Sequence, residues 1–210
     1  MHSNQIENYK EKLKLSKRQR EIIIGKLLGD GHLETANNGR TYRLKIEHSL
    51  KQKDYVDWCY QELKNWVLTK PKIKKQMIDK KVYQKYWFNT LSHGSFRFYA
   101  HQFYPQNRKV VPKLIHRWLT PLSLAVWFMD DGSIKSKFHR ARVINTQGFT
   151  KQEVERLIRV LRDKFEIQCK VRKQKEGYQI MILAESADKF AQIIKPYLCS
   201  SMHYKIKGLG

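Results

Sequence analysis

The chain has few cysteines and no long apolar run, and each shortage argues against a class of protein. Its cysteines, Cys59, Cys169 and Cys199, show no metal-ligand spacing, and their odd number argues against a disulfide framework. Because each lies in an apolar-patterned stretch, we expect buried free thiols in a reducing compartment. The eight histidines form no closely spaced pair, which gives a zinc site little support. No apolar run approaches the ~18 residues that a membrane-spanning helix requires.

Acidic residues are also scarce. The sequence has 19 Asp and Glu against 42 Lys and Arg, a formal net charge of +23. Because a folded domain gains no stability from self-repulsion, this excess predicts a polyanionic partner, with nucleic acid the first interpretation and an anionic membrane surface the second. The basic residues are spread along the chain and form no single amphipathic helix, which disfavours the membrane. The alternative is a lysine-rich codon bias that only decorates the surface.

An apolar run that ends in an acid followed by glycine occurs twice, as LLGDGHL at 27–33 and as FMDDGSI at 128–134. Similar patterns follow each copy. In the first half, helices are expected at 17–30, 53–67 and 96–104, with strands at 41–48, 72–78 and 82–91. In the second half, helices are expected at 122–131, 151–165 and 186–197, with strands at 140–146, 168–174 and 178–184. The sequence therefore predicts an α+β protein of two pseudo-symmetric αββαββα halves, at 1–104 and 121–210, joined by a connector at 105–120.

The repeated acid needs an explanation that a helix ending alone does not give. Glycine explains the stop, as a simple helix C-cap at Gly31 and Gly132. A carboxylate there faces the negative end of the helix dipole, which is mildly unfavourable. Two such acids, Asp30 and Asp131, therefore predict that a cation compensates both.

The stretches IIGKLLGDG and LAVWFMDDG resemble the two copies of the motif that defines the LAGLIDADG homing endonucleases. NTQGFTKQEVERL and IKPYLCSSMHYK extend the resemblance over nearly the whole chain. It implies two motif helices packed at a pseudo-twofold axis, where small residues such as Gly25 and Gly29 permit close approach. Val126 and Asp130 replace those small residues in the second copy. The strands of both halves would form a β-saddle that binds double-stranded DNA.

The resemblance also implies an active site. Asp30 and Asp131 would hold metal ions, with Gly29 and Asp130 as further ligands. Hard carboxylate oxygens with no nearby histidine or thiol favour Mg²⁺. The resemblance implies two or three such ions, with Mn²⁺ as a substitute. By their matching motifs, Lys109, Lys205 and Gln147 would complete the catalytic set. Each lysine has the alternative of contacting phosphate or solvent only.

Alternation along the strands selects outward basic residues expected to contact DNA in the major groove. Outward basic residues that merely aid solubility are the alternative at every one of these positions. The selected residues are Arg43, Lys45, Lys72, Lys74, Arg140, Arg142, Lys170 and Arg172. Arg40 and His48 complete the expected DNA-binding set.

Three functions remain in competition. The first is a monomeric, Mg²⁺-dependent endonuclease that cuts both strands of a long asymmetric target and leaves short 3′ overhangs. The second is an RNA maturase that assists group I intron splicing, and the third is a DNA-binding protein that no longer cleaves. The N-terminal segment has neither the apolar region of a signal peptide nor a clear transit peptide. We expect an organelle matrix such as the mitochondrion if the gene lies in an intron, and a bacterial cytoplasm otherwise.

The charge predicts that duplex binding weakens steeply with salt. A saddle that neutralises about 6–10 phosphates loses roughly 10³–10⁵-fold in affinity between 50 and 200 mM salt, because counterions are released on binding. Titration of a labelled duplex at several salt concentrations measures this slope. A nearly flat response would point away from duplex DNA as the partner.

Overall fold

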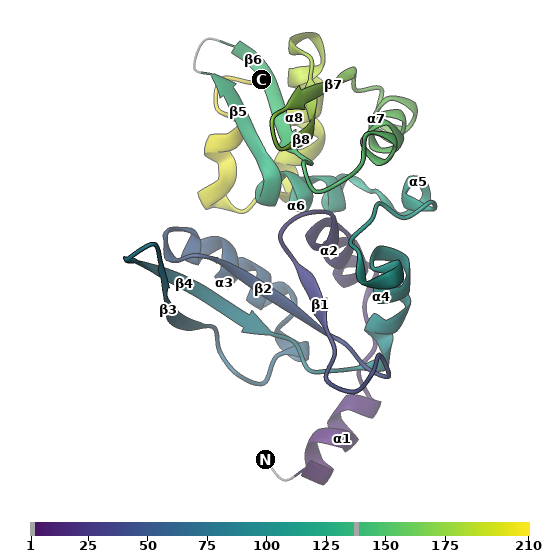
Figure 1. The fold of residues 1–210 in the computed structure, drawn as a ribbon, viewed down its shortest axis with the longest axis vertical. Coiled ribbons are helices and arrows are strands. Elements are labelled where there is room, and N and C mark those ends of the chain that lie inside the picture. The colour runs from purple at the N-terminus through teal and green to yellow at the C-terminus, as the bar shows by residue number, and fades with distance from the viewer. Residues whose placement is uncertain (1–2, 137–138) are drawn as a thin grey trace. The chain divides into compact units, whose positions relative to one another are not determined.

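The computed structural model describes residues 3–136 and 139–210. Its first half has a helix before each strand pair and one after them (Figure 1). The elements are α1 (Ser3–Glu11), α2 (Lys17–Leu28), β1 (His32–Glu34), β2 (Arg43–Ser49), α3 (Lys53–Glu62), β3 (Lys72–Ile78), β4 (Lys81–Asn89) and α4 (Arg97–Phe103).

The second half repeats this order after a one-turn helix in the connector. The elements are α5 (Ile115–Trp118), α6 (Pro121–Asp131), β5 (Gly132–Ser136), β6 (His139–Asn145), α7 (Lys151–Phe165), β7 (Cys169–Gln174), β8 (Gly177–Ile182) and α8 (Ala187–Ile194). A 3₁₀ segment, η7 (Ser200–Ile206), follows. The predicted α+β class and the αββαββα order from α2 onward are confirmed. Helices α1 and α5 and the short strands β1 and β5 were not located from the sequence.

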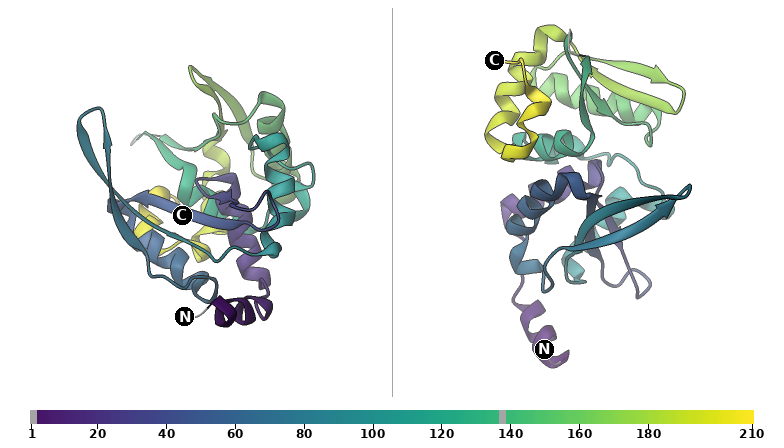
Figure 2. Two further views of the ribbon diagram at one scale, coloured as in Figure 1. Left: turned by 60° about the horizontal axis from the view of Figure 1, so that its bottom comes forward. Right: turned by 90° about the vertical axis from the view of Figure 1, so that its left-hand side faces the viewer.

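Both sheets have four antiparallel strands in the same spatial order. They run β1-β2-β4-β3 and β5-β6-β8-β7, as Figure 1 shows. In the first sheet, the β3–β4 hairpin extends past α3 (Figure 2). The shared order is the structural counterpart of the repeated sequence pattern.

Period-two alternation decides which face of each sheet is buried. In β2, Leu44 and Ile46 are fully buried against the side that α3 covers, whereas Arg43 is exposed. In the second sheet, Ile144 and Ile180 are fully buried beneath α7 and α8. The other face of each sheet is left for function.

Chain contacts divide the protein into two compact units. One comprises Met1–Arg20 and Asp30–His101, and the other comprises Glu21–Gly29 and Gln102–Gly210. Most of the first motif helix is therefore counted with the unit that holds the second motif helix. The predicted boundaries at residues 104 and 121 stay a prediction.

Within the second unit, Gly25 of α2 and Gly29, the residue after α2, face larger residues of α6. A Cβ on Gly25 would lie 2.6 Å from the Cβ of Val126, and a Cβ on Gly29 would overlap the Asp130 carboxylate. Where the second motif has a larger residue, Val126 or Asp130, the facing residue of the first motif is therefore a glycine. The close helix approach is kept because only one member of each pair is small.

Gly132 is the C-cap of α6, as expected, and its N–H donates to the carbonyl of Phe128. Its backbone is extended, with φ −74° and ψ 143°, and continues directly into β5. A Cβ at this position would overlap the Phe128 ring. Glycine is therefore required here for space and not for a left-handed conformation.

The expectation of free thiols is confirmed: all three cysteines are free, with Cys59 and Cys199 buried and Cys169 half-buried. Burial raises the pKa of the Cys169 thiol to about 12. Among the described residues, no helix combines the length and apolar character needed to cross a membrane.

The helix contact predicts that Gly25→Val destabilises the protein. The added atoms would collide with Val126 and the Ser123 carbonyl, and overpacking of this kind costs about 1–3 kcal/mol. For a chain of this size, each kcal/mol lowers Tm by about 2–4 °C. Thermal unfolding followed by circular dichroism measures the shift.

Gly94→Val is the matched control, because a Cβ at Gly94 would meet no atom within 4 Å. Equal Tm values for the two variants would contradict the close approach at Gly25.

Candidate active site

A lysine ammonium lies at the C-terminal end of each motif helix. Lys109 Nζ donates to the carbonyl oxygen of Gly29, the residue before Asp30. Lys205 Nζ donates to the carbonyl oxygens of Met129 and of Phe128 and Asp130, the last two at 3.3 Å each. The final carbonyls of a helix have no partner within it and carry its negative dipole end. The predicted compensation by a cation is therefore met in part by the protein itself, once in each half.

The two lysines come from segments outside the motifs. Lys109 belongs to the connector and is half-buried, whereas Lys205 lies in η7 and is only 5% exposed. A buried ammonium is stable only when its donors are satisfied, and three carbonyls satisfy Lys205. Their placement beside the motif acids was predicted by motif matching, and their catalytic roles stay predictions.

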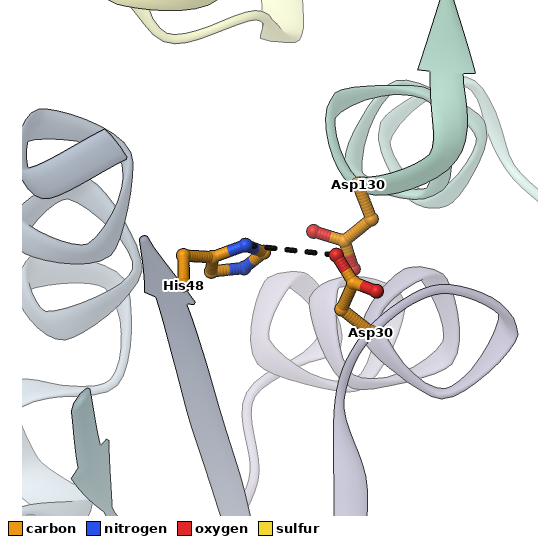
Figure 3. A group of neighbouring side chains, drawn as sticks. All are labelled: Asp30, His48 and Asp130. Carbon is orange, nitrogen blue, oxygen red and sulfur yellow. Dashed lines mark ion pairs between the residues drawn. The ribbon is translucent and has the colours of Figure 1, made fainter. Parts of the chain in front are cut away.

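In the first unit, Asp30 lies beside a histidine. The Asp30 side chain is 50% exposed, and its Oδ2 lies 3.6 Å from Nδ1 of His48, as Figure 3 shows. His48 is buried at the end of β2 and packs against the Tyr55 ring, with centroids 5.1 Å apart. The expectation that no histidine lies near the acids is wrong for Asp30. Strand β1 follows Asp30 directly and pairs with β2, which brings His48 of β2 close to it.

Asp30 and His48 open into a pocket of about 330 Å³. Ser49, the counterpart of Gln147, is exposed at its rim and caps the following 3₁₀ turn by accepting from Lys51 N at 3.4 Å. Lys85 also lines the pocket. Its position opposite Ser49 in the sheet register places it on the outward face. Sequence analysis missed Lys85, although the alternation of β4 was sufficient to select it.

In the second unit, Asp130 is held in a buried ion pair. Its Oδ1 lies 2.7 Å from Nζ of Lys26 on α2, and both side chains are fully buried. Figure 3 shows Asp130 on the last turn of α6. Lys26 was not singled out from the sequence, where it is one lysine among many. Its charge compensates Asp130 inside the protein, so the twin acids differ: Asp130 is buried against α2, whereas Asp131 is half-buried at the helix end.

Gln147 lies half-buried in the turn between β6 and α7. Its carbonyl would lie 2.7 Å from a Cβ on Gly177, whose φ of +140° also favours glycine. The turn is thus packed against the β7–β8 hairpin. The catalytic role of Gln147 stays a prediction.

On the first sheet, the predicted DNA-contact residues are interleaved with acids. Arg43 pairs with Glu34 at 2.8 Å, and Lys74 pairs with Glu47 at 2.6 Å. Lys45 lies 3.5 Å from Glu34. Arg40 and Lys72 are exposed. Glutamates that already orient these cations leave fewer free charges on this face than the sequence count suggests.

On the second sheet, the four predicted arginines and lysines separate. Lys170 and Arg172 pair in register with Met181 and Gln179, on the face away from α7 and α8. Arg140 is exposed and ion-paired with Asp188. Arg140 lines the same cavity as Arg142, the remaining member of the set, so neither belongs with Lys170 and Arg172.

Arg142 was expected to point outward, and this is wrong. Its side chain is 2% exposed, and its Nε and Nη2 donate to the carbonyls of Lys205 at 2.9 Å and Lys207 at 2.7 Å. It shares the face of buried Ile144, two residues along β6. Burial, and then the nearby Arg140 charge, lower the pKa of Arg142. Arg142 therefore ties the C-terminal segment to the sheet.

Comparisons with known proteins agree with this arrangement. Residues 20–190 match the model of the LAGLIDADG DNA endonuclease family. The DNA endonuclease I-ChuI of Chlamydomonas applanata is 31% identical over 211 residues, covering 92% of this chain and 96% of that protein. The cytochrome b mRNA maturase bI2 of Saccharomyces cerevisiae is 32% identical over 198 residues, 88% of this chain and 46% of that protein.

A solved structure is similar over the whole fold. The homing endonuclease I-WcaI bound to its DNA recognition sequence has a TM-score of 0.92 and 28% identity, covering 98% of this chain and 93% of that chain. The two four-stranded sheets with their helices therefore form a fold already seen on DNA in that protein.

The buried pair predicts that Lys26→Met is strongly destabilising. It leaves the Asp130 carboxylate without its buried partner, and loss of one member of such a pair costs about 3–5 kcal/mol. The double variant Lys26→Met/Asp130→Ala removes both charges and should regain most of that loss. Urea unfolding of the wild type, Lys26→Met, Asp130→Ala and the double variant gives the coupling free energy. Equal destabilisation of the single Lys26 variant and the double variant would contradict a functional pairing of the two side chains.

Proposed function

Since the chain belongs to the LAGLIDADG DNA endonuclease family, we propose that it is a site-specific, metal-dependent endonuclease that cuts both strands of a DNA duplex. The observation that carries the proposal is the repeated arrangement at the motif helix ends. Each half has an acid, Asp30 or Asp131, preceded by a carbonyl that accepts a hydrogen bond from a lysine ammonium, Lys109 or Lys205. Two equivalent acid–lysine sets suit two equivalent scissile phosphates.

Asp30 and Asp131 are the proposed metal ligands, aided by the carbonyls of Gly29 and Asp130. Support comes from the residues that precede the acids, because Gly29 and Asp130 contact each other within the second unit. The Asp130 side chain is engaged by Lys26. Its proposed contribution is therefore the backbone oxygen, which also accepts from Lys205 at 3.3 Å. Carboxylate and carbonyl oxygens fit Mg²⁺, and the His48 imidazole beside Asp30 also suits Mn²⁺.

Bound divalent ions supply Lewis-acid stabilisation of the phosphate and a lower pKa for an attacking water. The protein supplies position and charge. Asp30 and Asp131 orient the ions, and Lys109 and Lys205 each place a positive charge where negative charge develops on the phosphate. The carbonyl bonds of each lysine hold its ammonium in place before the substrate arrives.

Recognition is assigned to the outward faces of the two sheets. Arg43, Lys45, Lys72 and Lys74 serve the first half, and Lys170 and Arg172 serve the second. The halves differ in these residues and in Ser49 against Gln147, so unlike half-sites follow. One chain holds both motifs, which favours a monomer on a long asymmetric target. Short 3′ overhangs are what the resemblance to the family implies.

A second candidate function is assistance of intron RNA splicing. The similarity to a cytochrome b mRNA maturase favours it. That relative also favours expression from an organelle intron, and hence an organelle matrix as the place of action. DNA cleavage and RNA binding are compatible where they use different surfaces.

Asp30→Asn and Asp131→Asn each test the proposed centre. Each amide keeps the side-chain size but removes the charge that orients a divalent ion, so double-strand cleavage is expected to be lost. Duplex affinity should change little, because phosphate contacts by Lys and Arg supply most of it. The substrate is intronless DNA of the host locus, incubated with and without Mg²⁺.

Asp163→Asn is the matched control, since Asp163 is an exposed acid on α7. It should cleave like the wild type. Full cutting by both motif variants would refute the assignment, and binding of intronless DNA by the wild type without any cutting would favour the cleavage-deficient alternative.

A further inference from the structure

A basic cavity of about 660 Å³ lies at the free edge of the second sheet, outside the proposed active centre. Strands β5 and β6 form one wall and the C-terminal segment forms the other. Its volume lies within the ~300–1,000 Å³ that small ligands occupy. The lining includes Ile134, His139, Arg140, Arg142, Tyr204 and Lys207.

The cavity walls are fixed in place. Arg142 donates to the carbonyls of Lys205 and Lys207, which fastens the C-terminal segment to β6. Beyond it, Gly210 N donates to Asp188 Oδ1 at 3.0 Å, and Asp188 also pairs with Arg140. The segment is therefore attached on both sides of Lys207, and the cavity exists before any ligand binds.

Its chemistry combines exposed apolar surface with positive charge. Tyr204 is 54% exposed and Ile134 is 38% exposed, although both are large side chains. Lys207, His139 and Arg140 are exposed around them. Among the described residues that line the cavity, none carries a carboxylate. An aromatic ring beside such cations suits a base and its phosphate, and paired bases in a duplex do not present a free face for stacking.

The cavity lies on the face of the sheet opposite to the proposed DNA contacts. On β6, Arg142 pairs with Ile134 of β5, and the following residue, Val143, pairs with Met181 of β8. Met181 also pairs with Lys170 in register. Because side chains alternate along a strand, Arg142 and Lys170 point to opposite faces. A ligand in the cavity and a duplex on the outward face do not compete for the same side chains.

We propose that this cavity binds an unpaired nucleotide of single-stranded RNA, with the base against Tyr204 and the phosphate at Lys207. The inference rests on the proposed action on RNA and gives that action a surface. RNA is favoured over other polyanions because its loops offer unpaired bases, and the exposed ring would contribute little to binding phosphate alone.

Binding of a labelled oligouridine RNA to the full chain, measured by fluorescence anisotropy in EDTA, tests the proposal. Tyr204→Ala should weaken binding by about 5- to 150-fold, the range for loss of one base-stacking contact. Tyr204→Phe should bind like the wild type, because it keeps the ring. Lys207→Ala should also weaken RNA binding, while duplex DNA binding stays unchanged in all three variants.

Arg159→Ala is the matched control. Arg159 lines another basic cavity of the same unit, with Lys113, His116, Arg156 and Lys164, which has no phenylalanine, tyrosine or tryptophan in its lining. The proposal predicts a small loss for Arg159→Ala. Equal losses of RNA affinity for Arg159→Ala, Lys207→Ala and Tyr204→Ala would show that RNA binds but would overturn its assignment to this cavity.

Two further outcomes separate the ligand from the site. Equal affinity for oligouridine and for the corresponding single-stranded DNA would overturn the assignment to RNA. No binding of oligouridine by the wild type would overturn both the cavity and the proposed action on RNA. Neither outcome bears on DNA cleavage, which is measured separately with Mg²⁺.

Discussion

The close packing of α2 on α6 is the constraint on which the rest of the structure depends. Gly25 of α2 faces the larger Val126 of α6, and Gly29, just after α2, faces Asp130. Lys26, between those glycines, forms the buried pair with Asp130. Interiors packed at crystal-like density tolerate neither an added methyl group nor an unpaired charge. Within the second unit, the positions of Gly29 and Asp130, the residues that precede the motif acids, follow from this contact.

The second consequence concerns charge at those helix ends. An acid beside the negative end of a helix dipole is unfavourable unless a cation is near. Lys109 and Lys205 meet this requirement from two unrelated segments, the connector and η7. The acids remain in part accessible while the carbonyls before them each accept a hydrogen bond from a lysine. Stability of the helix ends and availability of the carboxylates are therefore compatible, which is what the proposed metal-dependent chemistry requires.

Basic residues that look alike in the sequence lie on different faces of the sheet, because side chains alternate along a strand. Lys170 and Arg172 lie on the open face of the second sheet, whereas Arg142 is buried beneath the C-terminal segment. The same guanidinium that was expected to contact DNA instead forms a wall of the basic cavity. On the first sheet, Glu34 and Glu47 already pair with the cations around them. High net charge thus predicts the class of partner but not which side chains meet it.

The sequence by itself determined the duplication and the αββαββα order from α2 onward, and it predicted two motif acids and one lysine for each half. These are carried by local signals: hydrophobic period, capping residues and a motif with its neighbours. Only the tertiary structure decided that His48 lies beside Asp30, that Lys26 pairs with Asp130 and that Arg142 is buried. Each of these joins residues distant along the chain or depends on which face of a strand is covered. Long-range pairing is set by packing of whole elements, and one lysine or arginine among 42 carries no local mark of it.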